Sequence, residues 1–250
     1  YLLRVVGEPE APADDGAWHQ RLIGLGLMVA RDDGEPVCSI AGLVLFGRSP
    51  RQKMRYAGVR WMSFSGTDMS YQAQDDSVID GPLVALWTGD HGQPSVDDGL
   101  IERLSSRMRP FVEVHSDGLQ DGLRRHIGLR FAAEAVREAM VNALVHRDWT
   151  RPVEVEIVNY ADRLEVTSPG ALQNSMTIEK MLAGQRSARN PVTMEVMRDY
   201  GYVEQRGMGV RRKIVPLTRD FTGRDAVFEA TDDFVRVVLP AAAALAEADK

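Results

Sequence analysis

Residues 134–149, EAVREAMVNALVHRDW, decide the fold, because a line of polar side chains runs through an otherwise apolar stretch. The apolar spacing predicts one helix over about 131–147. Glu138, Asn142 and His146 stand four residues apart, so in a helix they share one face. A buried carboxylate or amide without a partner costs on the order of a few kcal/mol. This face therefore either meets fixed partners in the fold or forms a site.

The sequence allows two interpretations of this line. In the structural one, Asn142 bonds a neighbouring backbone edge, and His146 lies at the helix C-terminus, where a cation is favoured. In the chemical one, the side-chain carbonyl of Asn142 is a ligand of Mg²⁺, which prefers oxygen and keeps several waters. Glu138 would then orient or deprotonate a water. The chemical interpretation requires a phosphate-binding element elsewhere in the chain.

A candidate for that element is RGMGV, residues 206–210, which precedes a predicted helix. Gly207 and Gly209 would let backbone N–H groups approach an anion. A simple left-handed turn would also explain two glycines here. The chain has no GxxxxGK[ST] and no HExxH, which excludes a P-loop protein and a zinc protease of that type.

The composition further narrows the functions and locations that this chain can have. The formal net charge of −6 over 250 residues opposes general capture of nucleic acid by this chain. A single cysteine, Cys38, rules out a disulfide framework and favours a reducing, cytoplasmic location. The sequence has no apolar run long enough to span a bilayer, so we expect no membrane partner.

The order of the predicted elements indicates an α+β fold, with an antiparallel or mixed sheet and helices on one face. Residues 152–170 alternate on both sides of a turn at 160–162 and predict a β-hairpin. A strand or a tail is expected at the N-terminus, and Ser95 or Asp97 is the expected N-cap of the helix at 95–111. The remaining predictions are helices at 17–30, 176–184 and 190–201 and strands at 57–66 and 225–240.

Three stretches together resemble a known family. They are FAAEAVREAMVNALVHRDW (131–149), VEVEIVNYADRLEVTSPGAL (153–172) and SARNPVTMEVMRDYGYVEQRGMGVRRKI (187–214). They resemble the divergent histidine-kinase-like (GHKL, Bergerat-type) ATPase domain of transcriptional regulators with a Schlafen/AlbA-type domain, often labelled ATP-dependent helicase-related. SIAGLVLFGRSP (39–50) resembles the linking segment of that family, so the resemblance spans about 17–240.

The resemblance implies a Bergerat-type α/β sandwich at 126–240, preceded by a smaller α/β linking region at 1–125 and followed by a flexible tail at 241–250. Residues 1–16 would be the remnant of an N-terminal DNA-binding domain absent from this chain. DNA would then be bound through that absent domain.

Site residues follow from the same resemblance. Glu138 corresponds to the water-activating carboxylate and Asn142 to the Mg²⁺ ligand. Gly207 and Gly209 correspond to the second glycine box, at the phosphates of ATP. The classical ATPases also place an aspartate after the second strand, to bind the adenine amino group.

At that place this chain has Thr167-Ser168-Pro169-Gly170 and no carboxylate. Ser168 and Gly170 are the expected cofactor-binding residues there, although a neutral hydroxyl is a weaker acceptor than a carboxylate. His146, Arg147 and Asp148 match an extension particular to this subfamily, whose role the sequence leaves open. We expect Arg147 to pair with Glu134 or Asp148.

Two functions remain in competition at this stage. In the first, the chain binds ATP and Mg²⁺ as a nucleotide-dependent module of a transcriptional regulator, and whether it hydrolyses ATP stays open. In the second, it is a degenerate, non-catalytic domain that forms a homodimer or docks a partner.

Overall fold

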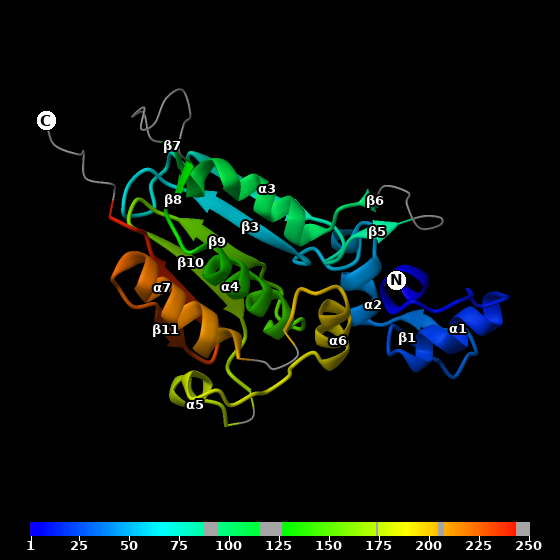
Figure 1. Ribbon diagram of the computed structural model, residues 1–250. Helices are drawn as coiled ribbons and strands as arrows, with labels where there is room; N and C mark the ends of the chain where they lie inside the picture. The colour runs from blue at the N-terminus through cyan, green and yellow to red at the C-terminus, as the bar shows by residue number, and fades with distance from the viewer. Residues whose placement is uncertain (88–94, 116–126, 174, 205–207, 244–250) are drawn as a thin grey trace, which may run out of the picture.

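A mixed six-stranded sheet forms the centre of the molecule in the computed structural model, which describes residues 1–87, 95–115, 127–173, 175–204 and 208–243 (Figure 1). The strand order is β11-β12-β10-β9-β3-β4. The strands are β3 (Gly58–Ser63), β4 (Asp75–Asp80), β9 (Val155–Asn159), β10 (Arg163–Pro169), β11 (Val227–Ala230) and β12 (Phe234–Pro240). The α+β prediction is confirmed.

The predicted hairpin is β9–β10, and it pairs on both sides with strands from distant parts of the chain. β10 pairs antiparallel with β12, and β9 pairs parallel with β3, so that Trp61 lies opposite Ile157. The sheet thus takes strands from both sides of the predicted boundary at 125/126, a boundary that remains a prediction.

Helices α3 (Leu100–Val112), α4 (Ala133–His146) and α7 (Val215–Thr222) lie across this sheet (Figure 1). Alternation along the strands turns Val59, Trp61, Ile157 and Val166 toward the helices. These side chains pack with the apolar faces of α3 and α4 in one continuous core, which fixes α4 over the sheet.

The opposite face of the sheet is mostly polar. Arg60 lies in register with Glu156 there. A small apolar cluster of Met62, Phe64, Val158 and Tyr160 forms a second core. This mixed sheet is mostly antiparallel, and with one polar face it needs a helical layer on the other side only.

Smaller elements surround the sheet. The helix η1 (Leu2–Val6), helix α1 (Asp15–Gly24), the pair β1 (Met28–Val29) and β2 (Val37–Cys38), and helix α2 (Ile40–Phe46) come first. The others are η2 (Pro50–Gln52), β5 (Leu86–Trp87), β6 (Ser95–Asp97), β7 (Glu113–His115), β8 (Ile127–Leu129), α5 (Ile178–Leu182), α6 (Pro191–Asp199) and η3 (Val210–Ile214).

Two local predictions are wrong. Leu2–Val6 is one turn of π-helix and not a strand. Helix α3 begins after Gly99, whose φ of 88° only glycine adopts easily, while Ser95 and Asp97 belong to β6. Asp97 still accepts a hydrogen bond from the N–H of Gly99, at 2.9 Å, so it supports the turn without capping the helix.

Across the described residues, the helices are all too short or too polar to cross a bilayer.

Candidate functional site

Helix α4 presents its polar line to the chain that follows β10. The helix forms because alanines, leucine, methionine and glutamate dominate residues 133–146, and all have high helix propensity. Ala135, Ala139 and Leu144 are buried in the core. Glu138 meets Gly209, and Asn190 donates to the carbonyls of the last turn, so both contacts come from beyond β10.

The first pair in the line is Glu138 and Asn142. The side-chain amide of Asn142 donates to Oε1 of Glu138 at 3.0 Å, one helical turn away. In the described part of the chain this hydrogen bond uses the amide nitrogen of Asn142, and Oδ1 is the atom that could act as a metal ligand. Amide carbonyl and carboxylate oxygens are the donor set that Mg²⁺ prefers, so this pair fits the ion.

Glu138 is a buried carboxylate with 8% of its surface exposed. Burial raises its pKa, while the hydrogen bond from Asn142 and the charge of Lys213 act in the opposite direction. A raised pKa brings a carboxyl group closer to the range in which it exchanges protons with water near neutral pH. The local environment therefore suits a proton-transfer role.

Gly209 lies directly on this carboxylate. A Cβ placed at position 209 would overlap with Oε1 and Cδ of Glu138. The φ of Gly209 is −57°, an ordinary helical value, so the left-handed-turn interpretation is wrong for this glycine. The contact explains the glycine, because no side chain fits between the turn and the carboxylate. Gly207 lies outside the described residues.

After Gly209 the chain forms one turn of π-helix, η3, and then continues into α7. Val215 donates to the carbonyl of Val210, a π-type bond. Pro216, at the first turn of α7, has no N–H to continue an α-type ladder. Single π-turns occur often at functional sites.

At the turn after β10, Ser168 and Gly170 have structural roles. The hydroxyl of Ser168 donates to the carbonyl of Ala143 at 2.9 Å, which joins β10 to α4, and the side chain is buried. Gly170 has a φ of +103°, and a Cβ there would come within 2.5 Å of the Cβ of Asp148. Ser168 thus lies beside α4 and Gly170 beside the residue two positions after it, and their role in binding a cofactor remains a prediction.

Asp148 brings a carboxylate to this turn from the end of α4. Its N–H donates to the carbonyl of Pro169 at 2.8 Å. One carboxylate oxygen accepts from the N–H and the hydroxyl of Thr150, and the other is paired with Arg189 at 2.9 Å. The sequence left the role of Asp148 open and did not place its carboxylate at this turn, because it comes from a neighbouring element and not from the strand.

Arg147 does not form the predicted ion pair with Glu134 or Asp148, whose partners are Lys213 and Arg189. It is fully buried and donates to the backbone carbonyls of Tyr56 and Val153, at 3.1 and 2.6 Å.

The guanidinium of Arg147 also lies 4.2 Å from the ring centroid of Trp149. Burial lowers its pKa to about 10, so it stays charged at neutral pH. Arg147 therefore ties the end of α4 to the start of the sheet.

His146 completes the polar line. Burial lowers its pKa, and the nearby charge of Arg189 lowers it further, so the imidazole is neutral at physiological pH.

A shallow hollow elsewhere, lined by Asp98, Glu102, Arg103, Ser106 and Arg107, lies along α3 and not at the polar line of α4. Glu138, Asn142 and His146 therefore do not line that hollow.

Residues 152–239 match the histidine-kinase-like ATPase family described as "Putative ATP-dependent DNA helicase recG C-terminal". The matched part includes the hairpin, Ser168, Gly170 and Gly209, whereas α4 with Glu138 and Asn142 precedes it. None of the curated proteins matches this sequence.

A crystal structure of the DIP2311 protein from Corynebacterium diphtheriae has a similar fold. The alignment covers 90% of this chain, with a TM-score of 0.61 and 23% sequence identity. It covers 41% of the other chain, so this sequence spans less than half of that protein. At this identity the likeness concerns the fold alone.

Proposed function

We propose that this chain, whose C-terminal part is a divergent histidine-kinase-like ATPase domain, binds a nucleoside triphosphate with Mg²⁺ along helix α4. One observation carries the proposal: Gly209, distant in sequence, lies directly on Glu138. The contact of Gly209 with the acid–amide pair supports a phosphate-binding role for the segment that contains this glycine.

In this proposal Asn142 holds the metal through Oδ1, and the segment that contains Gly209 binds the phosphates. Bound Mg²⁺ would neutralise phosphate charge. Glu138 lies one turn from the metal ligand and would orient a water, and hydrolysis of ATP would follow only when its carboxyl group is ionised.

At the part of the proposed site that would bind the adenine base, the polar groups already have partners within the protein. The hydroxyl of Ser168 already donates to Ala143, and the carboxylate of Asp148 is occupied by Thr150 and Arg189. We therefore propose that selectivity for adenine is weak and that most of the affinity comes from phosphates and metal.

Isothermal titration with a non-hydrolysable ATP analogue and Mg²⁺ tests the proposal. We expect saturable heat from the chain and none from Asn142→Ala, while Gln72→Ala, which truncates an exposed amide between β3 and β4, binds normally. Absence of heat from the folded wild-type chain would reject nucleotide binding. Circular dichroism of each variant shows that the comparison is made between folded proteins.

The same occupied turn favours the second function, a non-catalytic module that forms a homodimer or docks a partner. It predicts no nucleotide affinity and a concentration-dependent oligomer in sedimentation experiments. A monomer at high concentration would reject the homodimer. The role in a transcriptional regulator, the contact with DNA through another domain, and the cytoplasmic location belong to the proposal in either case.

A further inference from the structure

Helix α6 lies between α4, which carries the proposed site, and the N-terminal elements η1, α1, β1, β2 and α2 (Figure 1). Its N-cap residue is Asn190, whose side-chain amide donates to the carbonyls of Val145 and Arg147, at 2.7 and 2.9 Å. These carbonyls belong to the end of α4, where backbone acceptors lack partners within the helix. The first end of α6 is therefore fixed to α4.

The chain that leaves the other end of α6 is also held by α4. Arg137, on α4, donates from its guanidinium to the carbonyl of Gly201 at 2.9 Å. The same guanidinium lies 5.9 Å from the ring centroid of Tyr202. Residues 201–204 lead from α6 toward Gly209 along the chain. A displacement of α6 therefore acts on the segment that carries Gly209.

A stack of aromatic rings joins the end of α6 to η1 and β5. Tyr200, the C-cap residue of α6, stacks on Tyr1 and Trp87, with ring centroids 5.9 and 5.7 Å apart and interplanar angles of 8° and 12°. The hydroxyl of Tyr200 donates to the carbonyl of Ala85 at 3.0 Å, and the hydroxyl of Tyr1 donates to Asp199 at 2.5 Å. Stacked aromatic pairs stabilise a contact beyond the area that they bury. Tyr200 is thus the point at which α6 is attached to η1.

A second close contact joins α6 to the loop after α1. A Cβ placed at Gly26 would lie 2.9 Å from Cγ2 of Val192, which is in the first turn of α6. Helix α2 packs against α6 as well. Close-packed contacts transmit strain, because the neighbouring groups have no free volume into which to relax. The N-terminal elements and α6 are therefore expected to move together.

We propose that α6 is a coupling element between the N-terminal elements and the segment that carries Gly209, and that Tyr200 is the residue through which a change on one side reaches the other. The coupling itself is a property of the folded chain. Its use, which is to transmit nucleotide binding at α4 to the N-terminal elements, rests on the proposed function. Because coupling is reciprocal, loss of the joint must be visible on both sides of it.

The test is amide hydrogen exchange, measured by NMR in the nucleotide-free chain. One reporter is the N–H of Leu27, which donates to the carbonyl of Leu22 beside the Gly26 contact. The other is the N–H of Arg212, which donates to the carbonyl of Met208 across the position of Gly209. The amides of β9, a strand paired on both sides, are the reference for global unfolding.

Three variants are compared with the wild-type chain. Tyr200→Ala removes the stack, and Tyr200→Phe keeps the ring but loses the hydroxyl. Tyr71→Ala, at an exposed tyrosine between β3 and β4, is the matched control.

In Tyr200→Ala we expect exchange at both Leu27 and Arg212 to be at least about 2-fold faster, the smallest effect of losing one aromatic pair, with β9 unchanged. Tyr200→Phe and Tyr71→Ala should exchange as the wild-type chain does. Faster exchange at one reporter only, an equal rise in β9, or an equal rise in Tyr200→Phe would overturn the coupling through this stack.

A second measurement repeats the exchange with the non-hydrolysable ATP analogue and Mg²⁺. If the wild-type chain binds the analogue, we expect slower exchange at Leu27, and no such slowing in Tyr200→Ala. Binding that leaves Leu27 unchanged in the wild-type chain would overturn the transmission. If calorimetry detects no binding, the proposed function fails, while the nucleotide-free comparison still decides whether α6 couples the two sides.

Discussion

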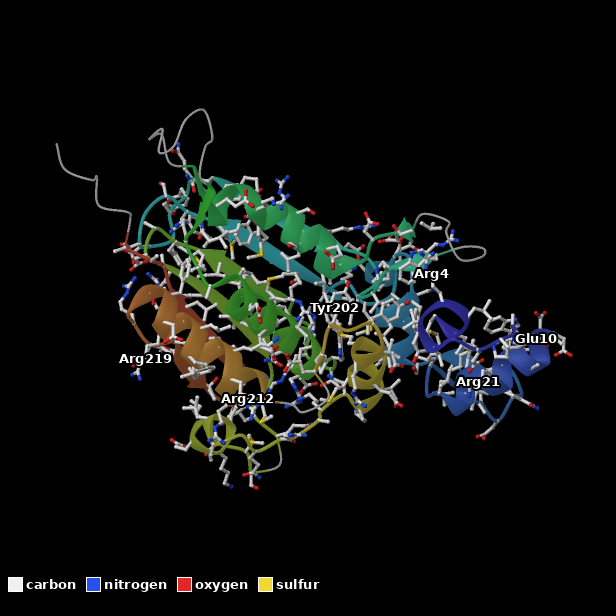
Figure 2. All side chains as sticks on the ribbon, in the orientation of Figure 1. Arg4, Glu10, Arg21, Tyr202, Arg212 and Arg219 are labelled. Carbon is white, nitrogen blue, oxygen red and sulfur yellow. The ribbon has the colours of Figure 1, made fainter. Side chains whose placement is uncertain are left out.

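Gly209 and Glu138 form a contact that admits no side chain between them: the Cα of the glycine lies where any Cβ would overlap with the carboxylate. The two residues come from α4 and from the position just before η3. Arg212, in the middle of η3, lies beside α5 in Figure 2. The carboxylate is buried because the backbone covers it. Burial is the largest cause of its raised pKa, and the close approach of Gly209 contributes to that burial.

Gly209→Ala tests this contact. The added methyl group must displace either the turn or the Glu138 side chain, and overpacking of this kind costs about 1–3 kcal/mol in unfolding free energy. Urea denaturation measures the loss. Gly66→Ala is the matched control, since a Cβ there meets nothing within 4 Å, and it should change stability by less than about 0.5 kcal/mol.

A double variant shows that Glu138 is the cause. In the background of Glu138→Ala, the same Gly209→Ala substitution should cost much less, because the clashing group is gone. Additive losses in the double variant would mean that the contact does not limit position 209.

The sequence predicted those parts of the fold that depend on local pattern. Helix α4 and the hairpin both follow from short-range periodicity. The parallel pairing of β3 with β9 was not predictable, because nothing local in residues 58–63 specifies a partner so far along the chain.

The same limit applies to the site. Spacing on one helix placed Glu138 and Asn142 together, and the structure shows their hydrogen bond. The approach of Asp148 to Gly170, by contrast, depends on how the end of α4 packs against the turn after β10. In the sequence, the only signs of this contact were Gly170 and a carboxylate, that of Asp148, to which no role had been assigned.

Gly170→Ala should destabilise the chain through two effects. The φ of +103° disfavours any side chain, and the new Cβ would lie 2.5 Å from the Cβ of Asp148. We expect a loss of about 2–4 kcal/mol, the sum of backbone strain and overpacking. Gly201→Ala is the control: its φ is +76° with nothing within 4 Å, so it isolates the strain. Equal losses in thermal or urea unfolding would refute the contact with Asp148.

Arg147→Met should lower stability even though it removes a buried charge. The carbonyls of Tyr56 and Val153 lose their donor in two partly buried hydrogen bonds. A buried acceptor without a partner costs about 1–3 kcal/mol, and partial exposure and the avoided desolvation of the guanidinium offset part of that cost. We expect a net loss of about 1–3 kcal/mol in urea denaturation. Arg151→Met, at an exposed ion pair with Asp233, should change stability by less than about 1 kcal/mol. A neutral or stabilising Arg147→Met would show that the arginine does not tie α4 to the sheet.

Glu138→Gln should stabilise the chain near neutral pH and weaken the proposed hydrolysis of ATP. The folded state raises the pKa of Glu138, chiefly through burial, so above the unfolded pKa of about 4.3 the folded chain holds its proton more tightly. Stability therefore falls as pH rises from the unfolded toward the folded pKa, and the loss persists at higher pH. Glutamine keeps an acceptor for Asn142 without a charge, so we expect a gain of about 0.5–2 kcal/mol at pH 7 and a flatter stability profile between pH 4 and 8. Urea denaturation across that range measures both, with Glu195→Gln, at an exposed carboxylate on α6, as a control that leaves the profile unchanged. If the variant is less stable than the wild-type chain at pH 7, burial of the Glu138 carboxylate does not lower the unfolding free energy, and the prediction is wrong.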